Sequence, residues 1–234
     1  MMLKPVAEHG IFSFKYHEYG TSVLGAPLLY FPAEKKTEWL VMAGFHGEEP
    51  EGVFLLSRIL RSLKNPFPFT SVILAVNPDG LSLGTRGNVN GVDLNRNFPT
   101  QNWQAQKHLS RPILEAEPEI ELSAGNAAAS EPETKYLIQL IESLSPKAVL
   151  SIHAPLACVD SKERSDAVVA LEKIFSIPWV EDIGYETKGS FGTWCTEKAI
   201  PCITLELPRK SGEEIIRDFQ SEFTEFLKNP PSCF

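Results

Sequence analysis

Hydrophobic positions along the chain fall into two kinds of pattern. Continuous apolar runs, which are typical of buried strands, lie at residues 28–31, 39–45, 71–76, 148–152, 179–183 and 201–207. Helical spacing recurs between them, at residues 53–63, 137–144, 168–175 and about 212–228. Strands that alternate with helices predict an α/β fold whose sheet is covered by helices on both faces.

Local signals refine this outline at a few places. Ser130-Glu-Pro-Glu133 has the composition of a capping box and predicts the start of the second helix at Ser130. Asn77-Pro-Asp-Gly80 has the composition of a turn. Residues 80–106 and about 106–129 show no regular pattern, so we expect loops there.

Length and composition exclude several classes of protein. A chain of 234 residues predicts a single domain spanning residues 1–234. The net charge of −8 argues against binding to nucleic acid, which requires many Lys and Arg side chains. No stretch reaches the ~20 apolar residues of a membrane span, and the N-terminus lacks the apolar core of a secretion signal. We therefore expect a cytoplasmic protein without a membrane partner.

The four cysteines carry no metal-binding or redox spacing. Cys158, Cys195, Cys202 and Cys233 include no C-x-x-C pair. In a cytoplasmic protein they are expected to be reduced thiols. Cys195 and Cys202 can lie close together, but no disulfide is predicted between them.

The end of the second apolar run offers two metal ligands. The run stops at His46, and Pro50 suits the first turn of a helix that starts close to Glu49. A catalytic zinc ion takes three protein ligands and leaves a fourth position open for water. His153, at the end of another strand-like run, is the candidate for the third ligand. For His9, His17 and His108 we expect a surface or packing role. A solvated helix start is the alternative interpretation of the His46–Glu49 step.

Further candidates lie at strand ends and in one polar loop. His46, Asn77, His153 and Glu206 all follow or end strand-like runs, and ligands of α/β sheets bind at the carboxyl ends of strands. Glu206 suits a general base if it faces the metal, because apolar surroundings raise the pKa of a carboxyl group. It can equally pair with an arginine or point to solvent.

The loop at residues 86–98 has the composition of an anion-binding segment. Arg96 suits a carboxylate through its planar guanidinium group, and Asn95 can add an amide donor. Arg86 can face an oxygen that becomes negative during acyl transfer. A solvated loop with internal turns is the alternative.

Taken together, these motifs resemble the zinc carboxypeptidases of the carboxypeptidase A type. The resemblance covers roughly residues 38–208 and rests on His46-Gly-Glu-Glu49, Asn77-Pro-Asp-Gly80, Arg86, Gly91-Val-Asp-Leu-Asn-Arg-Asn-Phe98, Ser151-Ile-His153 and Thr204-Leu-Glu-Leu207. It implies a mixed, mostly parallel twisted sheet with the active site at the carboxyl ends of the strands. A narrower resemblance, to bacterial γ-D-glutamyl-meso-diaminopimelate carboxypeptidases, extends over nearly the whole chain. It rests on residues 24–28, 87–93, 155–158 and 184–194.

The resemblance implies a role for each candidate. One zinc ion per chain would be bound by His46, Glu49 and His153, and Asp93 would accept a hydrogen bond from a ligand imidazole. Glu206 would activate water together with zinc, and Arg86 with zinc would stabilise the oxyanion. The remaining three residues would contact the substrate. Asn95 and Arg96 would bind its free carboxylate, and Tyr185 would close over it.

The narrower resemblance also implies a substrate. We expect hydrolysis of the γ-D-glutamyl–diaminopimelate bond of the murein tripeptide during recycling of peptidoglycan peptides. The side-chain specificity of the secreted digestive carboxypeptidases does not transfer, because the segment after Tyr185 differs. A zinc deacylase of the aspartoacylase or succinylglutamate desuccinylase type is the enzymatic alternative, and a non-catalytic binding protein is a second. The sequence permits a homodimer without pointing to one.

Overall fold

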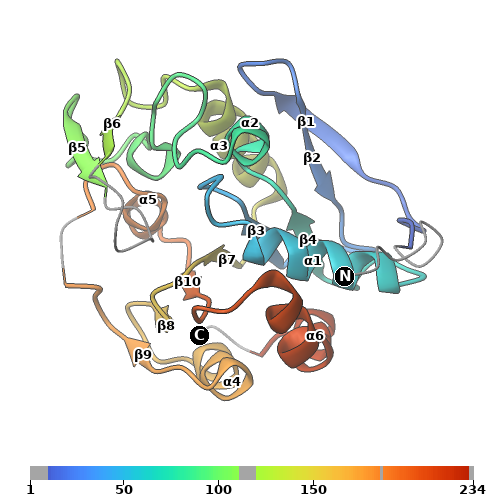
Figure 1. The fold of residues 1–234 in the computed structure, drawn as a ribbon. Helices are drawn as coiled ribbons and strands as arrows, with labels where there is room; N and C mark the ends of the chain where they lie inside the picture. Colours follow the sequence, from blue (N-terminus) through green and yellow to red (C-terminus); the bar gives the residue numbers. More distant parts are fainter. Residues whose placement is uncertain (1–9, 111–119, 185–186, 232–234) are drawn as a thin grey trace.

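A mixed eight-stranded sheet runs through the centre of the protein (Figure 1). The computed structural model describes residues 10–110, 120–184 and 187–231. Across the sheet the strands follow the order β1-β2-β4-β3-β7-β10-β8-β9. Their bounds are β1 His17–Thr21, β2 Pro27–Phe31, β3 Trp39–Ala43, β4 Thr70–Ile73, β7 Ala148–His153, β8 Cys158–Asp160, β9 Trp179–Val180 and β10 Cys202–Glu206.

The central strands are parallel and the flanking ones are mixed. β4, β3, β7 and β10 pair in parallel, as do β8 and β9. β1 with β2, β2 with β4 and β10 with β8 pair antiparallel. The predicted mixed, mostly parallel sheet is therefore confirmed. Because β3, β7 and β10 are parallel neighbours, the segments that follow them meet at one edge of the sheet.

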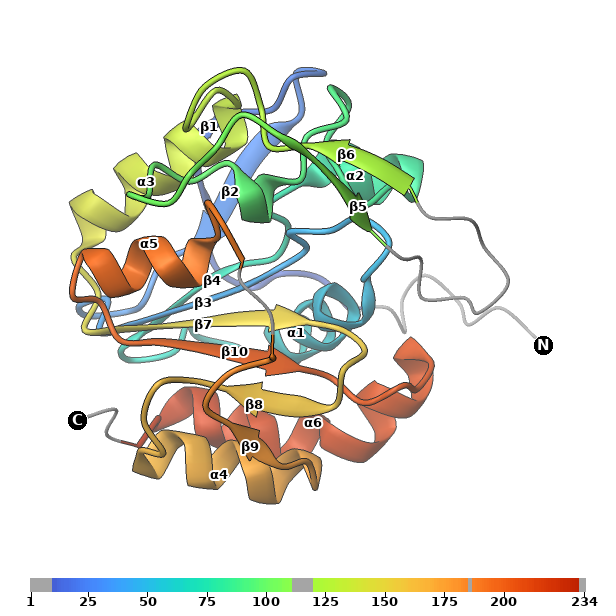
Figure 2. The same ribbon diagram turned by 90° about the vertical axis from the view of Figure 1, so that its left-hand side faces the viewer.

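Side-chain alternation along the strands creates a hydrophobic core on each face of the sheet. In β3, Val41 points into one core while Leu40 and Met42 point into the other. The first core is covered by α1 Glu51–Ser62, α4 Asp166–Phe175 and α6 Gly212–Lys228, and the second by α3 Pro132–Leu144 and α5 Phe191–Glu197. Figure 2 shows α3 and α5 on one side of the sheet and α4 and α6 on the other. No helix in the described ranges is long and apolar enough to cross a membrane.

The predicted capping box at Ser130 is wrong. The N-cap of α3 is Glu131, with Pro132 as the first helical residue and no side-chain cap. The Ser130 hydroxyl instead donates to Glu131 Oε1 at 2.6 Å and accepts from the Asn97 side chain. A complete capping box stands at Ser211 and Glu214, where α6 begins.

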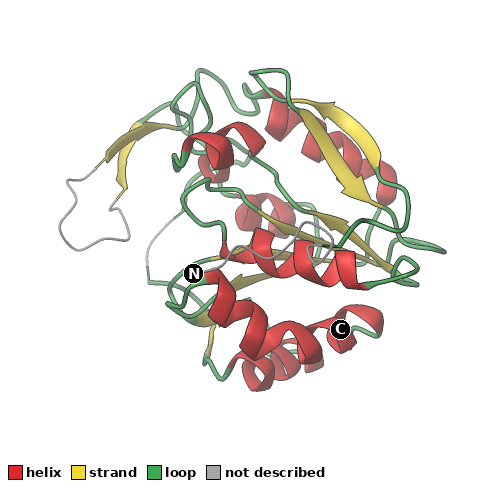
Figure 3. Ribbon diagram, turned by 45° about the vertical axis from the view of Figure 1, so that its right-hand side comes forward, coloured by secondary structure: helices red, strands yellow, loops and turns green. Residues whose placement is uncertain are grey.

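Several further elements lie where no helix or strand was predicted. Strands β5 Lys107–Ser110 and β6 Ile120–Ser123 form a separate antiparallel pair in the region expected to be loop (Figure 3). The short strands β1 and β8 were missed as well. Asn77, expected in a turn, is the N-cap of the short helix α2 Pro78–Leu83, and its side chain accepts from the Gly80 amide at 2.9 Å.

Candidate metal centre and substrate cleft

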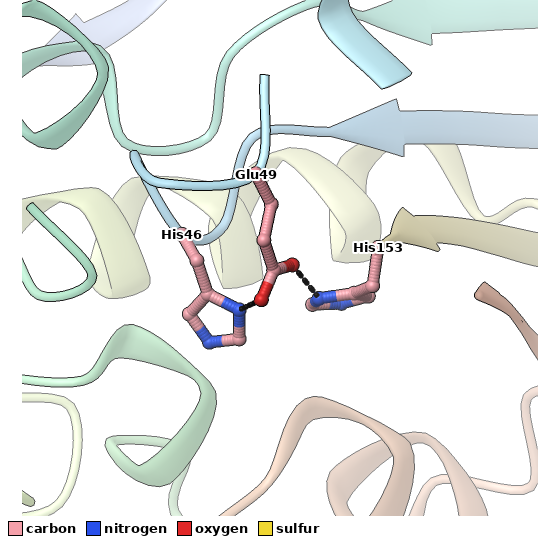
Figure 4. A group of neighbouring side chains, drawn as sticks. All are labelled: His46, Glu49 and His153. Carbon is pink, nitrogen blue, oxygen red and sulfur yellow. Dashed lines mark hydrogen bonds and ion pairs between the residues drawn. The ribbon is translucent and has the colours of Figure 1, made fainter. Parts of the chain in front are cut away.

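His46, Glu49 and His153 come together at the carboxyl end of the central strands (Figure 4). The Glu49 carboxylate lies between the two rings, with Oε1 2.8 Å from His46 Nδ1 and Oε2 3.1 Å from His153 Nδ1. One ligand atom of each residue lies within 4.8 Å of the others, and all three residues are buried. Two imidazoles and a carboxylate are a donor set that suits zinc.

The local chain path explains why these residues meet. His153 is the last residue of β7, and His46 follows the neighbouring parallel strand β3. Glu49 stands just before Pro50, the N-cap of α1. Between them, Gly47 passes so close to the backbone of Gly80 that a Cβ atom would overlap it. The turn at the start of α2 therefore fixes the position of the segment that carries His46 and Glu49.

The far nitrogen of each imidazole also has a partner. His46 Nε2 lies 3.2 Å from Asp93 Oδ1, and His153 Nε2 lies 2.9 Å from Ser151 Oγ. An acceptor at Nε2 holds the proton on that nitrogen and leaves the Nδ1 lone pair for a metal ion. Both rings are thus oriented with Nδ1 toward the same point.

Asp93 connects several groups of the site. It is fully buried at the N-cap of the short 3-10 helix η2, Leu94–Arg96, and accepts from the Asn95 amide at 2.9 Å. Its Oδ2 lies 3.4 Å from Arg86 Nε and 3.2 Å from His108 Nε2. Although burial opposes it, His46 and Arg86 hold the pKa of Asp93 well below its usual range. Asp93 is therefore a buried anion with four polar partners.

Charges in the centre compensate one another. Burial disfavours ionisation of both His46 and Glu49, but Glu49 raises the pKa of His46 and the two histidines lower that of Glu49. Arg86 Nη1 donates to Glu49 Oε1 at 3.0 Å and to Glu48 Oε1 at 3.1 Å. Glu49 is consequently an ionised carboxylate, as a metal ligand must be.

Glu206 ends β10 beside the candidate metal ligands. It is the register partner of His153 on β7, and its Oε2 lies 3.4 Å from the Leu156 amide nitrogen. Burial, reinforced by Glu49, raises the pKa of Glu206, while His153 opposes the rise. Neither alternative considered for this residue holds, because no arginine in the described residues pairs with it and β10 is an interior strand.

A cleft of about 1140 Å³ joins the candidate residues. It is lined by the three candidate metal ligands and by Arg86, Asp93, Asn95, Arg96 and Glu206. The side-chain oxygen Oδ1 of Asn95 accepts from the Phe191 amide at 2.9 Å, which turns the side-chain amide nitrogen of Asn95 toward the cleft. Arg96 Nη1 donates to the backbone carbonyl oxygen of Asn95 at 2.7 Å. The structure thus brings together eight of the nine predicted site residues.

The remaining predicted residues have varied outcomes. Tyr185, His9 and Cys233 lie outside the described residues. His17 is exposed on β1, as predicted, but the expectation for His108 is wrong, because His108 lines the cleft and contacts Asp93. It comes from β5, in a region with no sequence pattern, so no signal could have placed it there.

The cysteines within the described ranges have free thiols. Cys158, Cys195 and Cys202 form no disulfide there. Cys195 and Cys202 lie close enough for a side-chain hydrogen bond. Burial and this contact raise the pKa of Cys195 well above its usual value, so it is a poor nucleophile.

The chain is similar over nearly its whole length to proteins of assigned function. Residues 13–156 match the zinc carboxypeptidase family. The chain is 45% identical to murein peptide amidase A of Vibrio campbellii, over 98% of this chain and 94% of the relative. It is 42% identical to murein peptide amidase A of Escherichia coli K12, over 97% and 96%.

Solved structures agree with this similarity. The murein-tripeptide amidase of Escherichia coli O157 has a TM-score of 0.92 and 42% identity, covering 98% of both chains. Thrombin-activatable fibrinolysis inhibitor has a TM-score of 0.66 and 21% identity, covering 90% of this chain and 68% of its own. The second comparison reflects the fold alone.

Proposed function

Because this chain belongs to the zinc carboxypeptidase family, we propose that it hydrolyses the γ-D-glutamyl–meso-diaminopimelate bond of the murein tripeptide, L-Ala-γ-D-Glu-meso-diaminopimelate. The observation that carries the proposal is the nearly full-length similarity to murein peptide amidases, together with eight of the nine predicted site residues in one cleft. This similarity favours a peptidase over the deacylase alternative. The three candidate metal ligands, Arg86 and Glu206 all line this cleft, which argues against a binding protein without catalysis.

His46, Glu49 and His153 would hold the zinc ion. Their donor atoms point to one place, and both imidazoles have partners at Nε2 that leave Nδ1 available. When bound, zinc supplies a Lewis acid that lowers the pKa of water and polarises a carbonyl group.

Glu206 would act as the general base and then as the general acid. Its carboxylate accepts a proton from the attacking water and delivers it to the amine nitrogen of diaminopimelate as the amide bond breaks. Burial raises its pKa, which makes it a stronger base than an exposed glutamate. Its place beside His153 supports this role, because the attacked carbonyl carbon must lie next to the metal-binding group.

The two arginines would contact different parts of the peptide: the oxygen of the attacked carbonyl, which becomes negative during the reaction, and the carboxylate next to the scissile amide. Arg86 is held in place by Glu48, Glu49 and Asp93, and it would donate to the oxygen of the attacked carbonyl. Asn95 and Arg96 would bind the carboxylate next to the scissile amide. Closure of Tyr185 over the substrate stays a prediction. We also propose a cytoplasmic role in recycling of peptidoglycan peptides.

Release of diaminopimelate by the zinc-loaded protein tests this proposal. Mass spectrometry of the products of L-Ala-γ-D-Glu-meso-diaminopimelate should show free diaminopimelate with the wild type. Glu206→Gln should lower kcat by about 100- to 10,000-fold, the usual contribution of general acid–base catalysis, and should retain its zinc. Glu163→Gln, an exposed change outside the cleft, is the matched control.

Two results would contradict the proposal, one for its substrate and one for its general base. No release by the wild type would remove the murein substrate. Full activity in Glu206→Gln would remove the general base while leaving the substrate assignment intact.

A further inference from the structure

The floor of the cleft is a flat array of side chains from adjacent strands. On β10, Ile203 and Leu205 point into the hydrophobic core, so Cys202, Thr204 and Glu206 point into the cleft. The antiparallel neighbour β8 places Cys158 opposite Glu206, and Asp160 opposite Thr204. Asp160 therefore lies on the cleft floor beside Thr204, which precedes Glu206 by two residues on β10.

Within the residues that the structure describes, no basic side chain contacts the Asp160 carboxylate. It is partly buried and lines the cleft, and no hydrogen-bond donor lies against its side chain within the described ranges. Burial, together with Asp182 and Glu206, raises the pKa of Asp160 to about 6, and Lys162 opposes the rise only in part. A cation entering the cleft would supply the missing partner.

A lysine accompanies this aspartate. Lys162 follows Asp160 by two residues, is exposed and lines the same cleft. The far end of diaminopimelate carries one ammonium and one carboxylate on a single carbon atom. A neighbouring acid and base on one wall match such a zwitterion by charge.

The spacing between Glu206 and Asp160 matches the length of the diaminopimelate side chain. Residues that are diagonal across two strands lie about 7–8 Å apart, and Glu206 and Asp160 have this relation. If the amine of the scissile bond lies at Glu206, the three methylene groups of diaminopimelate carry its far end over Thr204 to Asp160.

We propose that Asp160 binds the ammonium group at the far end of diaminopimelate and that Lys162 binds the carboxylate beside it. This assignment rests on the proposed function and adds to it the residues that select the leaving amino acid. The enzyme would then select among leaving amino acids through the Asp160 carboxylate. An ammonium group pairs with this carboxylate, whereas an apolar side chain leaves it unpaired.

Three tripeptides that differ only in the last residue test the assignment. L-Ala-γ-D-Glu carries meso-diaminopimelate, L-lysine, which lacks the far carboxylate, or L-norleucine, which lacks both far groups. For the zinc-loaded enzyme, kcat/KM is measured with each peptide. If norleucine release is too slow to measure, the inhibition constant of that peptide replaces kcat/KM.

Asp160→Asn should lower kcat/KM for the diaminopimelate and lysine peptides by at least about 10-fold, as expected for a lost charge-assisted hydrogen bond. The value for the norleucine peptide should change by less than about 3-fold. Lys162→Gln should lower the value for the diaminopimelate peptide alone. Glu163→Gln, which removes a carboxylate of the same segment outside the cleft, should change none of them.

The ratios between peptides are internal to each enzyme preparation, so partial misfolding of a variant cancels. An equal loss for all three peptides in Asp160→Asn, or an unchanged ratio, would overturn the role of Asp160. A loss with the lysine peptide in Lys162→Gln equal to that with diaminopimelate would overturn the role of Lys162. Absence of cleavage by the wild type would instead refute the proposed function itself.

Discussion

Replacing Asp93 by asparagine separates the charge of this residue from its shape. The two Asp93 oxygens face His46 Nε2, Arg86 Nε, His108 Nε2 and the Asn95 amide. Asparagine keeps one acceptor oxygen. If that oxygen takes the place of Oδ1, it still accepts from His46 and the Asn95 amide, while its amide group faces Arg86 and His108 as donor against donor.

The expected cost falls mainly on zinc binding. His46 loses the negative charge behind it, and its Nδ1 becomes a weaker donor to a metal ion. Loss of such a supporting group typically costs 10- to 100-fold in metal affinity, which is about 1.4–2.7 kcal/mol. Ser151→Ala removes the neutral partner of the other imidazole, His153. We expect a loss below about 10-fold there, because a hydroxyl carries no charge.

Competition with a chromophoric chelator at fixed pH and ionic strength gives the zinc dissociation constant of each protein, with circular dichroism to check folding. A folded Asp93→Asn protein whose dissociation constant lies within about 3-fold of the wild type would refute the reasoning. Equal losses in Asp93→Asn and Ser151→Ala would show that the charge of Asp93 is not what matters.

Two further predictions concern stability. Gly47→Ala would press a methyl group into the Gly80 backbone and should cost about 1–3 kcal/mol of stability as well as zinc affinity, measured by urea denaturation and chelator competition. Gly192→Ala in α5, where a methyl group meets nothing within 4 Å, should do neither. Asp160→Asn should stabilise the fold at pH 8, because the pKa of Asp160 lies at about 6 rather than 3.8, and a folded pKa above the unfolded one penalises folding at higher pH. The full effect is about 3 kcal/mol, which solvent screening of a partly exposed group reduces to about 1 kcal/mol. The gain should vanish near pH 4 in parallel urea titrations, and an equal gain at both pH values would contradict an electrostatic origin.

Sequence pattern predicted the parts of the site that follow from strand ends. His46, His153 and Glu206 each close an apolar run, and the parallel order of β3, β7 and β10 brings those ends together. Long apolar runs are recognisable because their side chains are buried on both faces of the sheet.

Features that depend on contacts distant in sequence could not be predicted. His108 reaches Asp93 only because β5 and β6 pair with each other, and the strand propensity of that segment is weak. Ser130 has the residue spacing of a helix cap, but Asn97 and Glu131 engage its hydroxyl, so tertiary contacts override the local signal. Residues 155–164 are a candidate segment for the far end of diaminopimelate, but the sequence singles out no residue there, and only the register of β8 places Asp160 on the cleft floor.

Because side chains alternate along β10, the packing of its apolar residues in the core also fixes the orientation of Glu206 toward the cleft. A slip of one residue in this strand would expose Ile203 and Leu205 to the cleft and drive Glu206 into the apolar interior. Such a shift is blocked by the packing free energy of the whole sheet, which is far larger than any single contact in the site. Substitutions that keep the hydrophobic face of β10 therefore also keep Glu206 facing the cleft. The orientation of this carboxylate is as stable as the sheet itself.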